Sequence, residues 1–542
     1  MDPSMDINTF PTIVFTSVVE YLVLTVGIYK AVRLRLVNKL FNSEILFAIC
    51  NKQVIDIDDP ATPWVSERIH PSIKARIFLH RSLSGKGKQD SYVTTITSVN
   101  KAIDLLTQQT EEGRDKQHQI IAEAICTMHP HSIKRWQSSI NINTHIEAQN
   151  ILSGAIVLGN LHLVKSLLDA PNTLAGVNFE TPYFGRPLQL AAVWGHLHIV
   201  RYLIGRGANP RANSYDSEDD GSQNWRFDGM GSIDDKQRYY RKPRGSALRA
   251  AALGGHEDIV NLLLKPEYRL SIYKEEYFRA IMAAARGGHP NIWKLLIALT
   301  GKPLHRSIRL RDEIFWEATF HGREEVAQMV LDSGLDIDTK PRQEMYVSAL
   351  DIAAARGDIR MVRFLLDRGA STEPSVRMAA NPIKSAASGG HQEVVEMLLE
   401  HGANDEGVFE VATNRGQTRL VKWLLEKDPS SITMESRHGQ YTVGVSALLC
   451  AIQIRNADII ALLADAGVSL KGMPDTVFIP HGAELPSSVW IVNLLISLGI
   501  VDLDPEKYNS YQWTSEEDNI QSQLMRRRVK ISRRTWQWVG KH

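Results

Sequence analysis

Histidine is the residue type in this sequence that could most readily do chemistry, because an imidazole ring binds metal ions and transfers protons near neutral pH. The chain of 542 residues contains 18 histidines. Four of them directly follow a glycine in a recurring segment, as the pairs Gly195 and His196, Gly255 and His256, Gly288 and His289, and Gly390 and His391. Residues that occur once per segment do not form one cluster. We therefore expect these pairs to have a structural role in a turn, and we expect no metal site.

No signature of a nucleotide-binding or hydrolytic enzyme stands elsewhere in the sequence. The stretch SGKGK around Gly85 lacks the earlier glycine and the Ser or Thr that a phosphate-binding loop requires. No GxSxG, HExxH or protein-kinase signature occurs. The carboxylate pair Glu324 and Glu325 lies at the expected start of a helix, where it favours the helix dipole rather than acid–base catalysis. We expect neither enzymatic activity nor a cofactor.

Charge and cysteine content argue against two further kinds of site. The 62 Lys and Arg residues almost balance the 61 Asp and Glu residues, so direct nucleic-acid binding through a general positive field is not expected. Cys50, Cys126 and Cys450 lie far apart in the sequence, which disfavours a disulfide framework and fits a reducing compartment. They also lack the spacing of zinc ligands, which disfavours a zinc site. Any partner should be recognised by a local surface.

The segments that carry the Gly-His turns recur along most of the chain. Two apolar residues, two spacers and two further apolar residues appear in ten places. One anchor residue from each place gives the series Leu167, Leu203, Leu263, Leu296, Val330, Leu365, Leu398, Leu424, Leu463 and Leu495. Most neighbouring anchors are close to 33 residues apart, as Leu263 and Leu296 are. A fixed period of this length is the signature of a repeat protein.

Each repeat joins an alanine-rich segment to a segment of larger apolar residues. Alanines in stretches such as ALRAAALGGH, residues 247–256, let two helices approach closely, and the glycine before His allows a tight reversal. The second segment places Leu, Ile and Val at helical spacing. Because one repeat cannot bury this apolar face alone, neighbouring repeats must stack. The pattern predicts an all-α solenoid.

The stretch PLQLAAVWGHLHIVRYLIGRGANP, residues 187–210, closely resembles the ankyrin repeat family, and the resemblance extends over residues 151–502. It implies about nine to ten helix-turn-helix repeats with short β-hairpin loops and a helical N-terminal cap. It also implies that the turn histidines form hydrogen bonds to the turn and hairpin backbone. The turn histidines are thereby expected to be structural rather than metal-binding.

The sequence departs from the family pattern in three places. Leu398 and Leu424 are only 26 residues apart, which implies a shortened hairpin. Arg455 and Asn456 stand where Gly and His are expected, so the pattern defines that turn less well. Residues 485–500 keep only a second helix, which suits a degenerate C-terminal cap.

The resemblance further implies that the array binds a protein partner on a concave face formed by hairpin tips and first helices. The two positions before each turn glycine map near this face, and several hold residue types that are frequent in interface hot spots. We predict a partner-binding surface made of Tyr183, Phe184, Trp194, Arg286, Phe320, His321, Arg356 and Arg415. Such a surface suits a partner with acidic and apolar features. Alternatively, Trp194 merely covers a neighbouring insertion.

The chain falls into four regions on the basis of these patterns. We expect a hydrophobic N-terminal segment at residues 1–45, a helical cap at 46–150, the repeat array at 151–505 with a loop insertion near 211–244, and a basic, tryptophan-containing tail at 506–542. The insertion carries seven acidic residues from 213 to 235, followed by five basic ones from 236 to 244. A solvated loop is its simplest interpretation. Its aromatic residues offer a docking alternative: Trp225, Phe227, Tyr239 and Tyr240.

The tail contains a basic cluster made of Arg526, Arg527, Arg528, Lys530, Arg533 and Arg534. Such a run can be a nuclear-import signal or a nucleic-acid contact, although a solvated tail is the more usual interpretation.

The N-terminal segment has three interpretations. Residues 13–29 are mostly apolar and precede several basic residues, so insertion into a membrane would leave the repeats in the cytosol, but Glu20 near the middle would cost about 3 kcal/mol. Alternatively, residues 13–43 are a translated intron, because joining DINTFPT to EILFAI resembles the openings of fungal ankyrin and F-box-like proteins. The third interpretation is an ordinary helix packed on the cap. We favour the second.

The leading hypothesis for function is a non-enzymatic protein–protein interaction scaffold. Resemblance to fungal ankyrin proteins implies a transcription coregulator that acts through a partner, with a secondary-metabolite gene cluster as one setting for this role. The alternatives are an F-box-like substrate adaptor of a ubiquitin ligase and a membrane-tethered ankyrin scaffold. The expected location is nuclear or cytoplasmic, or membrane-anchored with cytosolic repeats if residues 13–29 insert.

Overall fold

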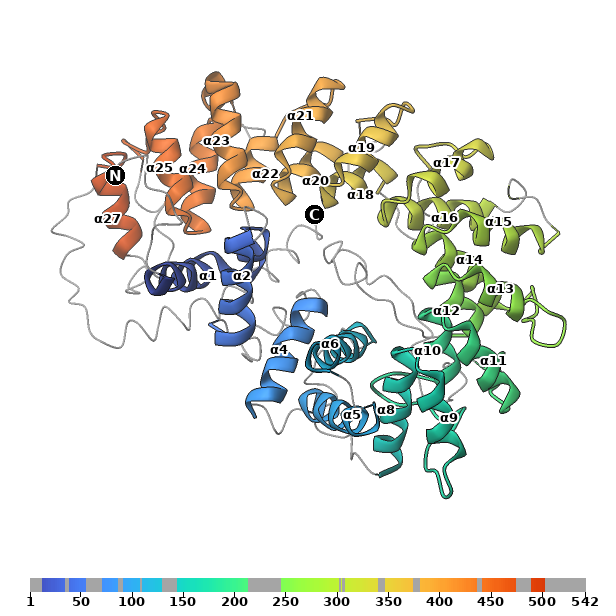
Figure 1. Cartoon of the computed structure of the whole chain (residues 1–542). Coiled ribbons are helices and arrows are strands. Elements are labelled where there is room, and N and C mark those ends of the chain that lie inside the picture. Colours follow the sequence, from blue (N-terminus) through green and yellow to red (C-terminus); the bar gives the residue numbers. More distant parts are fainter. Residues whose placement is uncertain are drawn as a thin grey trace. The chain divides into compact units, whose positions relative to one another are not determined.

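The computed structural model describes residues 12–34, 39–54, 71–85, 91–107, 110–128, 144–212, 245–301, 304, 308–339, 347–373, 381–435, 441–473 and 489–502. Most of these residues are helical, and the chain divides into two compact units. Unit 1 contains the helices that precede residue 306, and unit 2 contains the helices that follow residue 307 (Figure 1).

Unit 1 begins with helices α1 (Thr12–Leu34) and α2 (Lys39–Leu46) and the π-helix η2 (Phe47–Lys52). Helix α1 packs against both α2 and η2. The ring of Phe15 meets that of Phe41 edge-on at 5.5 Å between centroids. Thr16 Oγ1 donates a hydrogen bond to Glu44 Oε2 over 2.9 Å. These contacts are those of an ordinary packed helix, as the third interpretation of this segment expects.

None of the helices in the described part of the chain has both the length and the apolar character needed to cross a membrane.

Three longer helices follow, α4 (Pro71–Ser84), α5 (Ser91–Thr107) and α6 (Glu111–Met128), and each packs against the other two. Their contact is built from fully buried Phe78, Ile96 and Ile121. Helices α5 and α6 also contact α8 (Thr144–Val157), the first helix of the first repeat. The approach is close at Gly154, where an added Cβ would lie 2.7 Å from Val99 Cγ1. These helices therefore shield the start of the repeats.

Each repeat of unit 1 is a pair of helices joined by a short turn (Figure 1). Their first helices contact one another in succession, and so do their second helices. Buried alanines such as Ala191, Ala251 and Ala284 lie in the first helices, as the alanine-rich segments predict. The pairs are α8 with α9 (Leu161–Asp169), α10 (Pro187–Val193) with α11 (Leu197–Gly205), α12 (Ala247–Gly254) with α13 (Glu257–Leu263), and α14 (Glu275–Gly287) with α15 (Pro290–Ala298).

Unit 2 repeats the same arrangement and ends in an incomplete repeat. The units together hold nine helix pairs and one single helix in the described residues, which confirms the predicted solenoid of about nine to ten repeats. The elements of unit 2 are α16 (Ile308–Phe320) with α17 (Glu324–Asp332), α18 (Ala349–Arg356) with α19 (Ile359–Leu366), α20 (Pro382–Gly389) with α21 (Gln392–Glu400), α22 (Val408–Asn414) with α23 (Thr418–Lys427), the 3₁₀ helix η5 (Pro429–Thr433), α24 (Val443–Gln453) with α25 (Ala457–Asp465), and α27 (Val489–Ser497).

The loops between repeats contain no β-strand among the described residues, so the expected β-hairpins are reduced to isolated bridges. One bridge joins Thr181 to Gly185, and another joins Glu435 to Thr442. The turn that lacks Gly-His is nevertheless formed. Arg455 adopts the left-handed conformation with φ 57°, and the Asn456 side chain accepts a hydrogen bond from Ile459 N at the start of α25. Asparagine is a favourable N-cap, which compensates for the strained arginine.

Candidate protein-interaction surface

The turn histidines join each repeat to the one before it. His196 Nε2 lies 3.2 Å from the Val157 carbonyl oxygen, and His256 Nε2 lies 3.1 Å from that of Val193. The equivalent contacts are His289 Nε2 to Leu253 O and His391 Nε2 to Ala355 O, each 3.2 Å. Every acceptor belongs to the end of the preceding first helix, so these bonds hold the first-helix ends in register.

Glycine before the histidine is required by this close contact. Gly195 has φ +79°, a conformation that residues with a Cβ rarely adopt, and an added Cβ would overlap the ring of His256. In the repeat formed by α22 and α23, Gln417 replaces histidine, and its Nε2 donates to Ser388 O over 2.8 Å. A neutral side-chain N–H is thus sufficient at this position.

Burial lowers the pKa of His196 below its ordinary value of 6.5, and the nearby rings of His198 and His256 lower it further. The hydrogen bond to the Val157 carbonyl acts in the opposite direction. His196 is therefore favoured in its neutral form, with Nε2–H as the donor to the carbonyl. Among the described residues, no group of three or more His, Cys, Asp or Glu side chains could hold a metal ion.

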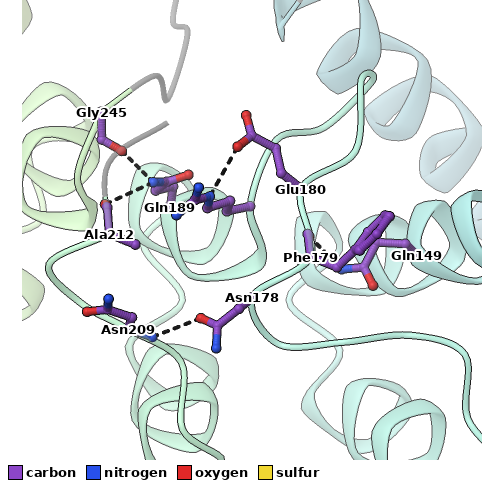
Figure 2. A network of polar contacts seen from close by, with 9 residues as sticks. Gln149, Asn178, Phe179, Glu180, Gln189, Asn209, Ala212 and Gly245 are labelled. Carbon is purple, nitrogen blue, oxygen red and sulfur yellow. Dashed lines mark hydrogen bonds and ion pairs between the residues drawn. The ribbon is translucent and has the colours of Figure 1, made fainter. Parts of the chain in front are cut away.

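The loops of neighbouring repeats are also tied together by side chains (Figure 2). Gln149 of α8 accepts a bond from Gly176 N over 2.7 Å and donates to the carbonyl oxygens of Gly176 and Phe179. Asn178 Oδ1 in that loop accepts from Asn209 N, in the next loop, over 2.9 Å. In unit 2, Asp338 Oδ1 accepts from Ser371 N over 3.0 Å in the same manner. Loop and helix ends therefore form a rigid frame within each unit.

The insertion lies between Ala212 and Gly245, and the buried side-chain amide of Gln189 binds the backbone at both ends (Figure 2). Gln189 Nε2 donates to Ala212 O over 3.4 Å and also to Gly245 O. Arg211 donates from its guanidinium to the carbonyl oxygens of Glu267 and Arg269. Residues 213–244 lie outside the described residues, and with them the predicted docking residues Trp225, Phe227, Tyr239 and Tyr240. The basic tail residues Arg526, Arg527, Arg528, Lys530, Arg533 and Arg534 lie outside them as well.

Three predicted surface residues have an accessible or partly accessible side chain at the end of a first helix. Trp194, at the C-cap of α10, is 36% exposed, whereas Val193 beside it is buried. Arg415, at the C-cap of α22, is exposed. Arg286, in the last turn of α14, is half-buried. These residues sit at corresponding turns of different repeats.

Two predicted surface residues are buried instead. Tyr183 is 2% exposed and Phe184 is fully buried, so neither can contribute to a partner-binding surface, and this prediction is wrong. The Tyr183 ring packs edge-on against Tyr92 of α5, with 5.6 Å between centroids. The loop before α10 thus folds inward, with the Tyr183 ring against α5.

The remaining three residues form a cluster in unit 2. The Arg356 guanidinium lies over the Phe320 ring, 4.4 Å from its centroid, and His321 meets that ring edge-on. Phe320 is buried by these neighbours, so its prediction as an exposed contact is wrong, while half-buried His321 and Arg356 cover it. Glu317 Oε2 is 3.4 Å from His321 Nε2.

Sequence reasoning missed Trp316, whose ring stacks on Phe320 at 5.9 Å and 8°. The two residues are four positions apart in α16 and thus share one face, a signal that the sequence contained. Trp316 is half-buried.

The comparisons with known proteins match repeated segments of this chain. The family model "Ankyrin repeats (3 copies)" matches residues 247–341 and 317–406, and the model "Ankyrin repeat" matches residues 186–215. The crystal structure of the human ASB11 ankyrin repeat domain is similar over 47% of this chain and 98% of that chain, with 19% sequence identity and a TM-score of 0.32. No curated protein matches the chain. Because both family models match where the structure has helix pairs, residues 186–215 and 247–406 of this chain are ankyrin repeats, a repeat type that implies a protein–protein interaction scaffold.

Proposed function

We propose that this chain is a non-enzymatic adaptor that binds a partner protein through side chains at the ends of its first helices. One observation carries the proposal. Trp194 is 36% exposed at a helix end whose backbone is held by Gly195 and by the His256 bond to Val193 O. A large aromatic residue on a fixed backbone gives contact area at low entropic cost.

The charge of the accessible residues indicates the chemistry of the partner. Arg415 is exposed and Arg286 is half-buried at the corresponding turns, and Arg356 covers an aromatic ring in unit 2. Arginine donates paired hydrogen bonds to carboxylates and stacks on planar groups. A partner segment with acidic and apolar side chains fits these positions.

The test compares Trp194→Ala combined with Arg415→Ala against Leu105→Ala. Leu105 is a 73% exposed apolar residue on α5, which precedes the repeats, and serves as the control. The first step identifies proteins retained by the tagged wild-type chain and measures the affinity of the purified partner. We expect the double variant to weaken that affinity at least about tenfold, since hot-spot truncations cost 1–2 kcal/mol or more.

The control variant should bind as the wild type does, and all three proteins should share one melting profile. Equal affinity of the double variant and the wild type would place the binding surface elsewhere on the chain.

A finer proposal concerns the process. We propose that the adaptor acts as a transcription coregulator in the nucleus, with the basic cluster at residues 526–534 as its import signal. A fluorescent fusion in which those Lys and Arg residues are replaced by Gln should lose nuclear accumulation. Unchanged accumulation would remove the support that the tail gives to this proposal. The alternative of an F-box-like adaptor requires a transcript without residues 13–43, which sequencing across those codons decides.

A further inference from the structure

The loop between α13 and α14, residues 264–274, concentrates positive charge. Its exposed cations are Lys265, Arg269 and Lys274, and its exposed acidic residue is Glu267. Arg211 of the preceding loop is also exposed and lies against this one. Its Nε donates to Arg269 O over 3.2 Å, and its Nη2 donates to Glu267 O over 2.8 Å. Because the whole chain has a formal net charge of only +1, the positive field here is local.

An exposed aromatic side chain stands among these cations. Tyr273, which precedes Lys274, is 86% exposed. Leu270 in the same loop is 5% exposed and anchors the loop in its place. Tyrosine is frequent in interface hot spots, because its rigid ring gives contact area at low entropic cost. We call the following residues the basic loop surface: Arg211, Lys265, Arg269, Tyr273 and Lys274.

The backbone below this surface is held in shape. Tyr268 N and Arg269 N both donate to Lys265 O over 2.9 Å, and Lys274 N donates to Ser271 O over 3.1 Å. The two bonds from the Arg211 guanidinium join this loop to the preceding one. A surface whose backbone is already ordered loses less entropy when a partner binds.

The fold itself does not require positive charge at this position. Corresponding loops of unit 2 carry exposed acidic residues instead, as Asp336, Glu373 and Asp405 show. Elsewhere in unit 1, Arg206 forms an ion pair with Asp169. Within the described part of the chain, no such pair neutralises the cations of the basic loop surface. Their charge is therefore available to a partner.

The chemistry of this surface selects among occupants. Carboxylates complement its charge, and arginine binds them through paired hydrogen bonds. Nucleic acid fits less well, because binding through charge alone usually involves more phosphate contacts, about six to ten, than these side chains can make. A second copy of the chain also fits less well. Two loop carboxylates of unit 2, those of Asp338 and Glu373, already accept backbone N–H groups from Ser371 and Asn404.

We propose that the basic loop surface binds an acidic segment of a partner protein, with carboxylates on its Lys and Arg side chains and an apolar side chain on Tyr273. The surface lies where first helix α14 begins, whereas the helix-end residue Arg286 lies in the last turn of α14. It is therefore separate from the first-helix ends of the proposed function, and either surface can bind without the other.

The experiment measures fluorescence anisotropy of a labelled peptide of about ten residues, all glutamate except for a central pair of leucines, with the full chain. We expect wild-type binding that weakens as salt is raised. Arg269→Glu combined with Lys274→Glu should weaken the affinity at least about tenfold. Arg363→Glu combined with Arg419→Glu is the matched control, because it changes the net charge equally at exposed positions of α19 and α23. This control should bind as the wild type does.

Two further variants separate the parts of the proposal. Tyr273→Ala should weaken binding of this peptide and leave binding of an all-glutamate peptide unchanged, because only the first peptide has apolar side chains for the ring. Trp194→Ala combined with Arg415→Ala should bind the peptide as the wild type does, since the helix ends are a different surface. Peptide binding that depends on this pair instead would assign it to the helix ends and overturn the proposal.

Circular dichroism should show the same helical content for every variant, and Arg269→Gln alone replaces the double charge reversal if that variant does not fold. Absence of wild-type binding, or equal affinities of the charge-reversed and control variants, overturns the proposal. Tighter binding of single-stranded DNA of about ten nucleotides would assign the surface to nucleic acid. Peptide binding that requires the acidic residues of 213–235 to be changed to Asn and Gln would assign it to the insertion. Oligomers that the charge reversal dissociates, detected by light scattering, would assign it to a second copy.

Discussion

At the scale of single residues, the contact that organises this molecule is the bond from a turn side chain to a carbonyl of the preceding repeat. His196, His256, His289 and His391 make it through Nε2, and Gln417 makes it through its amide. The bond needs a donor of suitable length and a preceding residue without a side chain. It does not need a proton that can be gained or lost, so His196, whose pKa is lowered by burial, carries a pH dependence that the contact itself does not require.

The lowered pKa of His196 predicts how stability responds to pH. The unfolded chain, whose histidine has a pKa near 6.5, takes up the proton before the folded chain does. The contribution of His196 to stability is therefore present above about pH 6.5 and is lost as the pH falls toward its lower folded-state pKa. The variant His196→Gln has at this turn the residue type that Gln417 provides in another repeat. When the pH is lowered from about 7.5 to about 5.5, we expect its free energy of unfolding to fall less than that of the wild type. Denaturant unfolding at both pH values measures this, and identical losses would contradict it.

Glycine at the turn has its own prediction. Gly195→Ala should lower the free energy of unfolding by about 2 kcal/mol or more, because it adds a Cβ at positive φ and forces the His256 ring to move. Gly205→Ala is the control: an added Cβ there meets nothing within 4 Å, and its backbone is helical. That change should shift stability by less than about 1 kcal/mol. Similar effects of the two substitutions in chemical denaturation would show that the close contact is not what requires Gly195.

At the scale of elements, the first helices carry the residues of the proposed binding surface, and side chains connect the loops of neighbouring repeats. Gln149 and Asn178 connect successive loops of unit 1, and Asp338 does the same in unit 2. Gln189 is the distinctive member of this set, because its buried amide donates to the two residues that flank the insertion. A long insertion can interrupt the repeats at this point because its two ends remain fixed to the same helix.

The role of Gln189 can be measured. Gln189→Leu keeps a similar volume but leaves the Ala212 and Gly245 carbonyl oxygens without their amide donor, so the free energy of unfolding should fall by about 1–3 kcal/mol. Gln392→Leu, at an exposed position of α21, should change it by less than about 0.5 kcal/mol. Equal stabilities of the Gln189 variant and the wild type would mean that the amide does not hold the insertion.

At the scale of the whole molecule, two units carry helix pairs of the same design, and the family matches extend over residues of both. Accessible Trp194 lies in unit 1 and accessible Arg415 in unit 2. The adaptor proposal therefore does not require one continuous site. Each unit can be tested through its own helix-end residue, because Trp194→Ala and Arg415→Ala are separable changes.

The sequence by itself determined the repeat, its period and the glycine at each turn, since stacking requires small residues and apolar faces at fixed intervals. The turn at Arg455 and Asn456, which lacks the Gly-His pair, was defined less well by the pattern, and the structure shows it formed. Only the tertiary structure decided which variable side chains reach solvent. Tyr183, Phe184 and Phe320 occupy positions that the pattern treats as surface, yet all three are buried. The Tyr183 ring packs against Tyr92, which is distant in sequence, and Phe320 is covered by Arg356 of the next repeat. Exposure depends on what packs against a residue, and no local pattern of the chain records that contact.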